Sequence, residues 1–441
     1  MSFAKVNNDI LRTLGPAGRI YWAGLILALT MLGFGGYAFY HQVRFGLGVA
    51  GYNPPVMWAI YITNFVFWVG IAHSGTLISA VLFLFRARWR TSVARVAEAM
   101  TVFAVMTAGL FPIIHLGRPW YFYWLLPYPD QRDLWINFRS PLIWDVFALG
   151  TYLTVSVLFL YLGLIPDIAI ARDRVQDYRR KLYSILALGW QGTNQQWRHY
   201  NALYGFLAAL ATPLVISVHS VVSWDFATTI LPGWHSTIFA PYFVAGAIFS
   251  GLAMVITLLI PLRRFYHLEE YITVRHFENL AKLIIVTSLI VTYAYATEYF
   301  MAWYSQNEFE RSTFLDRAAG QYAPFFWTTV VCNCIVPLAL FFKKIRTHLK
   351  TLFVISLLIN VGMWLERYVI IISSLSHDFN PSVWPAMYQP TWVEVMITAG
   401  SMGLFFFLFL IFVKNFPLIS MTEIKENTTT VTSPIVMEGS S

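Results

Sequence analysis

Ten apolar runs dominate this sequence, and each is near or above the ~20 residues that an α-helix needs to cross a lipid bilayer. Backbone N–H and C=O groups find no water inside lipid, so an open chain segment there must form a helix. Charged residues make up only 12% of the chain, against roughly 25% in soluble domains. We therefore expect an all-α polytopic membrane protein with about ten transmembrane helices. The runs cover residues 19–41, 57–85, 93–115, 140–164, 200–223, 237–262, 276–303, 323–342, 351–375 and 392–414.

Lysine and arginine gather in alternate connections between these runs, in segments 86–95, 172–198, 263–275 and 343–350. Connections with this bias remain on the cytoplasmic side of a membrane. We therefore expect both termini to be cytoplasmic and the odd-numbered helices to run outward. The net charge of +8 then reflects topology and not nucleic-acid binding. Residues 417–441 are rich in Thr, Glu and Ser and are expected to form a disordered cytoplasmic tail.

The run GLFPIIHLGRPW, residues 109–120, ends the third predicted helix and leaves His115 at its outer end. The fourth helix begins outside at Ser140, which can cap it, followed by a proline suited to the first turn. Asp145 then lies about one turn, or ~6 Å, below that end. The topology brings further polar residues to a similar depth near the outer face, namely His219, Asp225 and Glu298.

These residue types suit the oxidation of a lipid-soluble quinol. A quinol gives up two protons with its two electrons, so a base is needed near each ring oxygen, and a histidine with an aspartate meets that need. We expect His115 and Asp145 to be those bases, with an apolar, aromatic wall holding the ring. The alternative is that all these side chains are interfacial, in contact with outside water and without a chemical role.

A second polar set falls in the inner halves of the predicted helices. His73 and Glu98 lie in the second and third helices, and Glu278 and Lys282 are spaced i,i+4 at the start of the seventh. Together they could line a proton half-channel. Helix–helix hydrogen bonds and charged side chains reaching the interface explain them equally well. In the ninth helix, Glu366-Arg367 is expected to be an internal charge pair.

The sequence predicts no cofactor bound by this chain. Its ten histidines show no pairing on facing helices of the kind that holds a b-type haem, and no CxxCH motif for a c-type haem is present. Cys332 and Cys334 are two thiols, whereas an iron–sulfur cluster takes four, so we expect them to be buried packing residues. No metal or phosphate-binding motif is present either. If electrons move, they must pass to a partner chain.

Two runs, residues 73–101 (HSGTLISAVLFLFRARWRTSVARVAEAMT) and 109–129 (GLFPIIHLGRPWYFYWLLPYP), resemble the NrfD-like membrane subunits, which are related to the membrane anchor of polysulfide reductase. Within that family the chain looks most like the ActC membrane subunit of bacterial alternative complex III. The resemblance implies one membrane domain over residues 1–416, built from two four-helix bundles with flanking first and last helices. Helices 2–5 (57–223) form the first bundle and helices 6–9 (237–375) the second.

The resemblance also implies a function, exerted as part of a bacterial inner-membrane complex. Such subunits bind menaquinol or another quinol near the periplasmic face, and they work beside an iron–sulfur subunit, a second NrfD-like subunit and c-type cytochrome subunits. On the motif match, the residues of the quinol site fall at His115, Asp145 and Asp225. Arg118 and His219 are expected to complete it, and His73 and Glu98 to belong to a proton route.

Three alternatives remain open from the sequence. The chain could be the quinone-reactive membrane subunit of a molybdenum oxidoreductase, in which the same site would serve. It could be a secondary transporter, although no pair of matching broken helices is seen at the midplane. It could also be a pure anchor for extrinsic subunits. Residues 304–322 are the most charged outer segment and could dock a partner.

Overall fold

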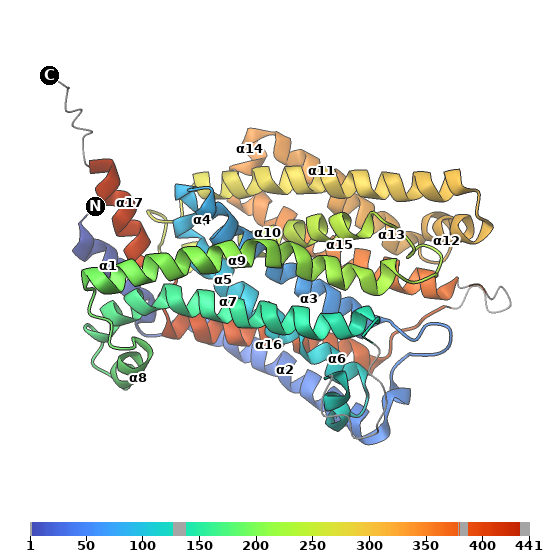
Figure 1. Ribbon diagram of the computed structural model, residues 1–441, viewed down its shortest axis with the longest axis horizontal. Coiled ribbons are helices and arrows are strands. Elements are labelled where there is room, and N and C mark those ends of the chain that lie inside the picture. Colours follow the sequence, from blue (N-terminus) through green and yellow to red (C-terminus); the bar gives the residue numbers. More distant parts are fainter. Residues whose placement is uncertain (1, 127–137, 378, 380–386, 433–441) are drawn as a thin grey trace.

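The computed structural model describes residues 2–126, 138–377, 379 and 387–432 of the 441. Its regular elements within these residues are helices, and ten spans are long and apolar enough to cross a membrane. This confirms the fold class expected from the sequence. The helices α1 (Phe3–Leu11), α8 (Arg179–Leu186) and α17 (Met421–Thr432) lie at one end of the molecule, whereas α6 (Leu110–His115) and α12 (Glu308–Ala319) lie toward the other (Figure 1). We call these the inner and outer ends.

Some of the ten spans are single helices and others combine consecutive helical pieces. The single helices are α2 (Arg19–Phe45), α7 (Pro141–Arg172), α9 (Asn194–Ala227), α10 (Phe239–Phe265), α11 (Val274–Ser305), α15 (Leu349–Ser376) and α16 (Trp392–Asn415). The composite spans are α3 (Ile60–Thr76) with η3 (Leu77–Val81) and α4 (Leu82–Leu84), α5 (Ala94–Ala108) with α6, and α13 (Ala323–Val330) with η6 (Val331–Ile335) and η7 (Val336–Phe341). Both η3 and η6 are π-helical, a local widening that is frequent at functional sites.

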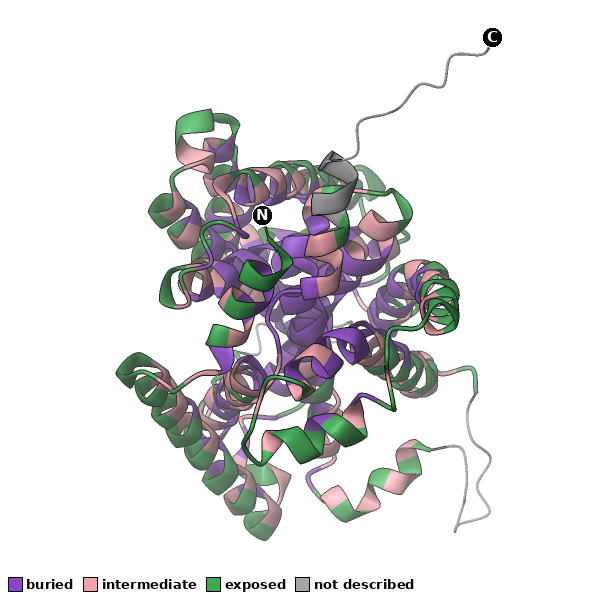
Figure 2. Ribbon diagram, turned by 90° about the vertical axis from the view of Figure 1, so that its left-hand side faces the viewer, coloured by how far each residue is buried: buried purple, intermediate pink, exposed green. Residues whose placement is uncertain are grey.

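The spans pack as two groups of four with a flanking pair. In the first bundle, α3, α5, α7 and α9 pack around one another, and in the second α10 and α15 pack with α11 and the α13–η7 span. The bundles meet mainly where α3 packs against α10. These two helices are the most enclosed, with 83% and 78% of their apolar windows buried, against 17% for α2. Buried residues accordingly occupy the centre of the molecule and exposed ones its periphery (Figure 2).

The flanking helices α2 and α16 approach each other closely because glycines face each other where they cross. A Cβ atom on Gly35 would lie 2.5 Å from the Cα of Gly400, and one on Gly403 would lie 2.6 Å from the backbone N of Leu32. Small residues at such positions allow the close backbone contact that holds membrane helices together.

The first part of the C-terminal segment that was expected to be disordered is helical in the structure. Residues 421–432 form the helix α17 (Met421–Thr432), which returns to the inner end of the first bundle. The backbone N–H of Thr422 donates to Asp167 at 3.2 Å, and Glu423 pairs with Arg90 at 2.9 Å. Composition alone predicted disorder because it could not show that two buried charges offer partners to this segment. Residues 433–441 lie outside the described part of the chain.

Candidate functional site

His115 is the last residue of α6, and the local sequence fixes where that helix ends. Gly117 follows with φ +70°, a left-handed conformation that favours glycine and commonly closes helices. A Cβ atom there would also lie 3.0 Å from the Cβ of Leu47. Gln42 of α2 donates its amide to the Ile114 carbonyl at 2.8 Å, which ties the helix end to α2.

The His115 ring lies against an aromatic wall and has a free nitrogen. Its centroid is 5.5 Å from that of Tyr52, edge to face, and Tyr52 makes the same kind of contact with Tyr61. The hydroxyl of Tyr61 donates to Gln42 at 2.5 Å. Nδ1 of His115 is buried and has no hydrogen-bond partner among the described residues. A buried imidazole nitrogen without a partner is costly unless a ligand or water completes it.

Asp145 and Asp225 come together at the outer end of the first bundle. Asp145 lies one turn inside α7, which starts with Pro141 in its first turn, although the side chain of Ser140 makes no capping bond. Asp225 lies in the last turn of α9. Both are buried, and their carboxyl groups are close enough to interact electrostatically. Within the described residues, no donor reaches either oxygen of Asp145 or Oδ1 of Asp225.

The predicted site residues are therefore only partly in contact. His115, Asp145 and Asp225 lie near the ends of three helices at the same end of one bundle, but no hydrogen bond or ion pair within the described residues joins His115 to either aspartate. Arg118 is exposed after Gly117, where its side chain is open to solvent. The aspartate pair can hold one proton between its carboxyl groups, whereas His115 stands ready as a separate acceptor.

His219 lies in the interior and not beside the aspartates. Its ring packs against that of His73, with centroids 4.6 Å apart. His73 lies in α3 and His219 in α9, so the two rings join these helices inside the first bundle. The sequence suggested no histidines on facing helices, and the structure shows that these two face each other. Nδ1 of His73 lies 2.6 Å from the Val69 carbonyl, whereas its Nε2 and both nitrogens of His219 have no partner within the described residues.

Polar groups continue from this histidine pair toward the inner end. The His73 ring lies 5.2 Å from that of Tyr152, whose hydroxyl shares a 2.8 Å hydrogen bond with Thr76. Thr76, with Ser79 of the π-helical η3 and Glu98 of α5, lines a small cavity of about 10 Å³. That volume is comparable to the ~10–15 Å³ that one water needs.

Glu98 connects this cavity to a buried charge cluster at the inner end. It accepts a 3.4 Å hydrogen bond from Tyr204 and lies 3.9 Å from Arg95, which pairs with Asp167 at 3.0 Å. Asp167 was not expected in this helix from the sequence, because the apolar run ends near residue 164, whereas α7 continues to Arg172. Tyr152 and Tyr204 were not expected either, because nothing in the sequence distinguishes them from the many other aromatic residues of the chain.

Glu278 and Lys282 do not belong to this polar series. They form a 3.3 Å ion pair at the inner end of α11, and Glu278 also pairs with Arg346 at 3.1 Å. The Lys282 side chain is 54% exposed, so the group is a surface ion-pair cluster. Cys332 and Cys334 are buried and free, as expected for packing residues. Within the described residues, no three His, Cys, Asp or Glu side chains are grouped so as to hold a metal ion.

Comparison with known proteins identifies relatives over most of the chain. The model of the family described as "Polysulphide reductase, NrfD" matches residues 48–377. A membrane subunit of a putative dimethyl sulfoxide reductase of Halobacterium salinarum is 30% identical over 58% of this chain and 54% of its own length, so the match spans about half of that relative. A subunit of the selenate reductase of Mesobacillus selenatarsenatis is 20% identical over 89% of this chain and 94% of that protein. An Hdr-like menaquinol oxidoreductase integral membrane subunit of Archaeoglobus fulgidus is 20% identical over 97% and 98%.

Proposed function

Because this chain belongs to the NrfD family of polysulphide reductase membrane subunits, we propose that it is the quinol-oxidising integral subunit of a bacterial inner-membrane complex of the alternative complex III type. The observation that carries the proposal is the set of unsatisfied proton acceptors at the outer end of the first bundle, namely Nδ1 of His115 and the Asp145–Asp225 carboxyl pair. The match of the menaquinol oxidoreductase subunit over nearly its whole length supports the substrate class.

The proposed reaction assigns one proton acceptor to each quinol hydroxyl. One hydroxyl gives its proton to the neutral imidazole of His115, and the other gives its proton to the aspartate pair. As the two O–H bonds break, two electrons leave the ring for an iron–sulfur subunit and then for c-type haem subunits. The ring becomes a quinone. Both acceptors lie at the outer end, so the protons leave to the periplasmic side.

Two further features fit this role. Tyr52 and Tyr61 provide an aromatic wall beside His115 on which a quinol ring can pack. Arg118, exposed beside the loop, is available to orient the ring or the partner subunit. In the first bundle the series from His219 and His73 to Glu98 is the proposed proton route between this site and the inner side.

A second candidate is the quinone-reactive membrane subunit of a terminal reductase, working with a molybdenum subunit. The names of the dimethyl sulfoxide reductase and selenate reductase relatives favour it. The two candidates differ in their partners: c-type haem subunits belong to the first, a molybdenum subunit to the second. Purifying the complex through a tag on this chain and recording its haem spectrum separates them. A transporter would instead move solute without any partner, and a pure anchor would not bind quinol.

The site is tested by His115→Ala in the purified complex. Removal of one proton acceptor should lower the rate of quinol oxidation by ~10²–10⁴-fold, while the partner proteins still co-purify. His199→Ala, which changes an exposed histidine at the inner end, is the matched control and should leave the rate unchanged. Near-normal turnover in His115→Ala would exclude this site as the place of quinol oxidation.

A further inference from the structure

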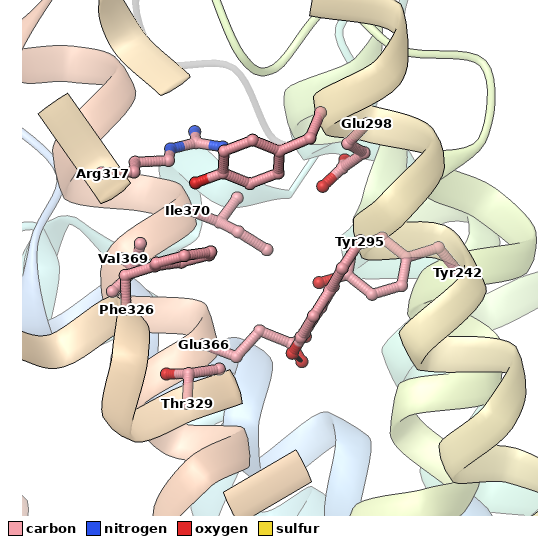
Figure 3. A pocket seen from close by; sticks show the side chains of 10 residues that line it. Tyr242, Tyr295, Glu298, Arg317, Phe326, Thr329, Glu366, Val369 and Ile370 are labelled. Atoms are coloured by element: carbon pink, nitrogen blue, oxygen red, sulfur yellow. Dashed lines mark hydrogen bonds between the residues drawn. The ribbon is translucent and has the colours of Figure 1, made fainter. Parts of the chain in front are cut away.

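The second bundle encloses a cavity that the quinol site does not use (Figure 3). Its volume is about 30 Å³. This exceeds the ~10–15 Å³ that a water needs and is far below the ~300 Å³ of a small-molecule pocket. Glu298 and Arg317 lie at one end of the cavity, and Glu366 and Thr329 lie at the other (Figure 3). The cavity therefore has room for one or two waters between two buried carboxyl groups.

The cavity also offers hydrogen bonds that no protein group fills. The hydroxyls of Tyr242 and Tyr299, both in its lining, are buried and have no partner within the described residues. Buried water is found where two to four such polar groups converge. The lining thus satisfies both conditions for bound water, space and polar partners.

At its inner end the cavity reaches a buried ion pair. Glu366 pairs with Arg367 and accepts a hydrogen bond from the Tyr295 hydroxyl. Asn333 donates its amide to Tyr295 at 3.1 Å and reaches Glu366 at 3.4 Å. Asn333 is the central residue of the π-helical η6, whose widened turn carries it toward Glu366. The carboxyl group of Glu366 is therefore held in place from three sides.

At its outer end the cavity is bounded by Glu298, which also lines two larger cavities of about 240 and 780 Å³. These two, which we call the outer vestibule, lie at the outer ends of α10 and α11 and are lined by His235, Ser236 and Met301 among others. Glu298 itself is buried. It is the residue that the lining of the small internal cavity shares with the linings of both cavities of the outer vestibule.

The charged side chains around the cavity determine which kind of ion it can hold. Arg317, fixed by 2.7 Å bonds to Ser373 and Ser374, and Arg367 are both close enough to oppose a metal cation. Glu298 and Glu366 oppose an anion. The lining is instead suited to a proton, which the carboxyl groups and the water can share.

We propose that the second bundle contains a proton-exchange path to the outer side, in which Glu298 connects Glu366 with the outer vestibule. A proton leaves the carboxyl group of Glu366 through cavity water and binds the Glu298 carboxylate, and Glu366 is left ionised and paired with Arg367. Glu298 then releases the proton to water in the vestibule. No electron moves in this step.

Arg367 links the path to the first bundle. Its guanidinium lies 4.8 Å from the centroid of the Phe243 ring, and the centroid of that ring lies 5.9 Å from that of the His219 ring. When Glu366 binds a proton, Arg367 loses its counter-charge and raises the cost of a positive charge on the His73–His219 pair. Protonation in one bundle thus opposes protonation in the other, which is the coupling that ordered proton transfer requires.

The test uses the native complex in proteoliposomes. It rests on the proposed function, because quinol oxidation by the complex drives the proton release that is measured. Two quantities are recorded, the rate of quinol oxidation with the membrane uncoupled and the number of protons released outside per electron. Glu298→Gln should leave the rate unchanged and abolish the protons released in excess of the quinol's own two. The control Glu308→Gln removes an exposed carboxylate at the same end of the molecule and should keep both quantities unchanged.

Tyr299→Phe provides a second variant, because it removes an unpartnered hydroxyl and keeps the ring contacts with Phe314 and Phe326. It should lower the excess protons without changing the rate. The proposal is overturned if Glu298→Gln keeps the excess, if the unsubstituted complex shows none, or if quinol oxidation stops with Glu298→Gln. Failure of the quinol site is seen separately, as normal turnover in His115→Ala.

Discussion

Asp145 and Asp225 place their buried carboxyl groups close enough to interact electrostatically at the outer end of the first bundle, and within the described residues no N–H or O–H donor satisfies Asp145. Two carboxylates at this separation repel each other when both are ionised, so the pair is arranged to hold one proton. A buried pair of this kind is suited to accept a proton and pass it on. The first bundle keeps this arrangement where α7 begins and α9 ends.

Asp145→Asn tests the pair directly. The amide is isosteric, so the fold should persist, but it cannot take up a proton, and quinol oxidation should fall by ~10²–10⁴-fold. The turnover of the purified complex measures this. Asp177→Asn, at an exposed aspartate paired with Arg179 in the connection after α7, is the control. If the two aspartates act as one unit, adding Asp225→Asn should cost little more. Additive losses in the double variant would contradict a shared role.

Gly35→Ala tests the crossing of α2 and α16. The new Cβ would lie 2.5 Å from the Cα of Gly400, so the helices must separate. Overpacking of this kind costs about 1–3 kcal/mol, and the midpoint of thermal unfolding should fall. Gly33→Ala lies on the same helix with open space around its Cβ, and should leave the midpoint unchanged. Equal midpoints for the two variants would show that the close contact does not stabilise the protein.

Glu423→Gln tests the docking of α17. Arg90 and Glu423 form a 2.9 Å pair, with their side chains 6% and 16% exposed. Burial lowers the pKa of Arg90, but the nearby carboxylates, of which Glu423 has the largest effect, raise this pKa by more than burial lowers it. The guanidinium therefore keeps its charge. Loss of one partner from such a buried pair costs about 3–5 kcal/mol. Limited proteolysis should cut near residue 421 faster in this variant than in Glu269→Gln, where the carboxylate is exposed. Unchanged cleavage would show that other contacts hold the segment.

Glu310 should give the outer loop a pH dependence. Burial raises the pKa of Glu310 above its ordinary value of 4.5, although the N–H of Gly233, 2.9 Å away, and Arg317 lower it in part. The folded state therefore binds this proton more tightly than the unfolded state does. The resulting stabilisation is complete below pH 4.5 and is lost as the pH rises through the folded-state pKa.

Hydrogen exchange of α12, compared between the unsubstituted chain and Glu310→Gln, measures this effect. Exchange in the unsubstituted chain should speed up from pH 4.5 upward more than the intrinsic rate requires, and the variant should lack that additional increase. An equal increase of the exchange rate with pH in both proteins would show that Glu310 does not cause the pH dependence.

Much of the first-bundle site could be read from the sequence because helix ends are encoded locally. The run from Gly109 to Gly117 contains both the helix and the residues that end it, so the place of His115 at a helix terminus followed directly. Asp145 was placed by the same local logic, one turn after Pro141. The Glu366–Arg367 pair was recognised because charges in an apolar run need partners, and neighbours in sequence supply them.

Lateral contacts could not be read in this way. His219 was grouped with the outer residues by its depth, but its partner is His73, because the rotation of α9 about its axis turns the ring inward. Glu278 and Lys282 were grouped with His73 by depth as well, yet they form a surface cluster with Arg346. The depth of a residue along a helix follows from the number of residues between it and the end of the helix. The direction in which its side chain points depends on which helices pack together.

The sequence by itself determined that ten helices are long and apolar enough to cross a membrane, and it predicted which of their ends face inward and that His115 and Asp145 lie at the outer end. These follow from local hydropathy, charge counts and helix stop signals, which need no knowledge of neighbours. Only the tertiary structure decided that Asp225 lies near Asp145, that the rings of His73 and His219 pack together, and that Glu298 lines both the internal cavity and the outer vestibule. Each of these depends on side chains from different helices sharing one small volume, and the packing of the helices alone sets that volume.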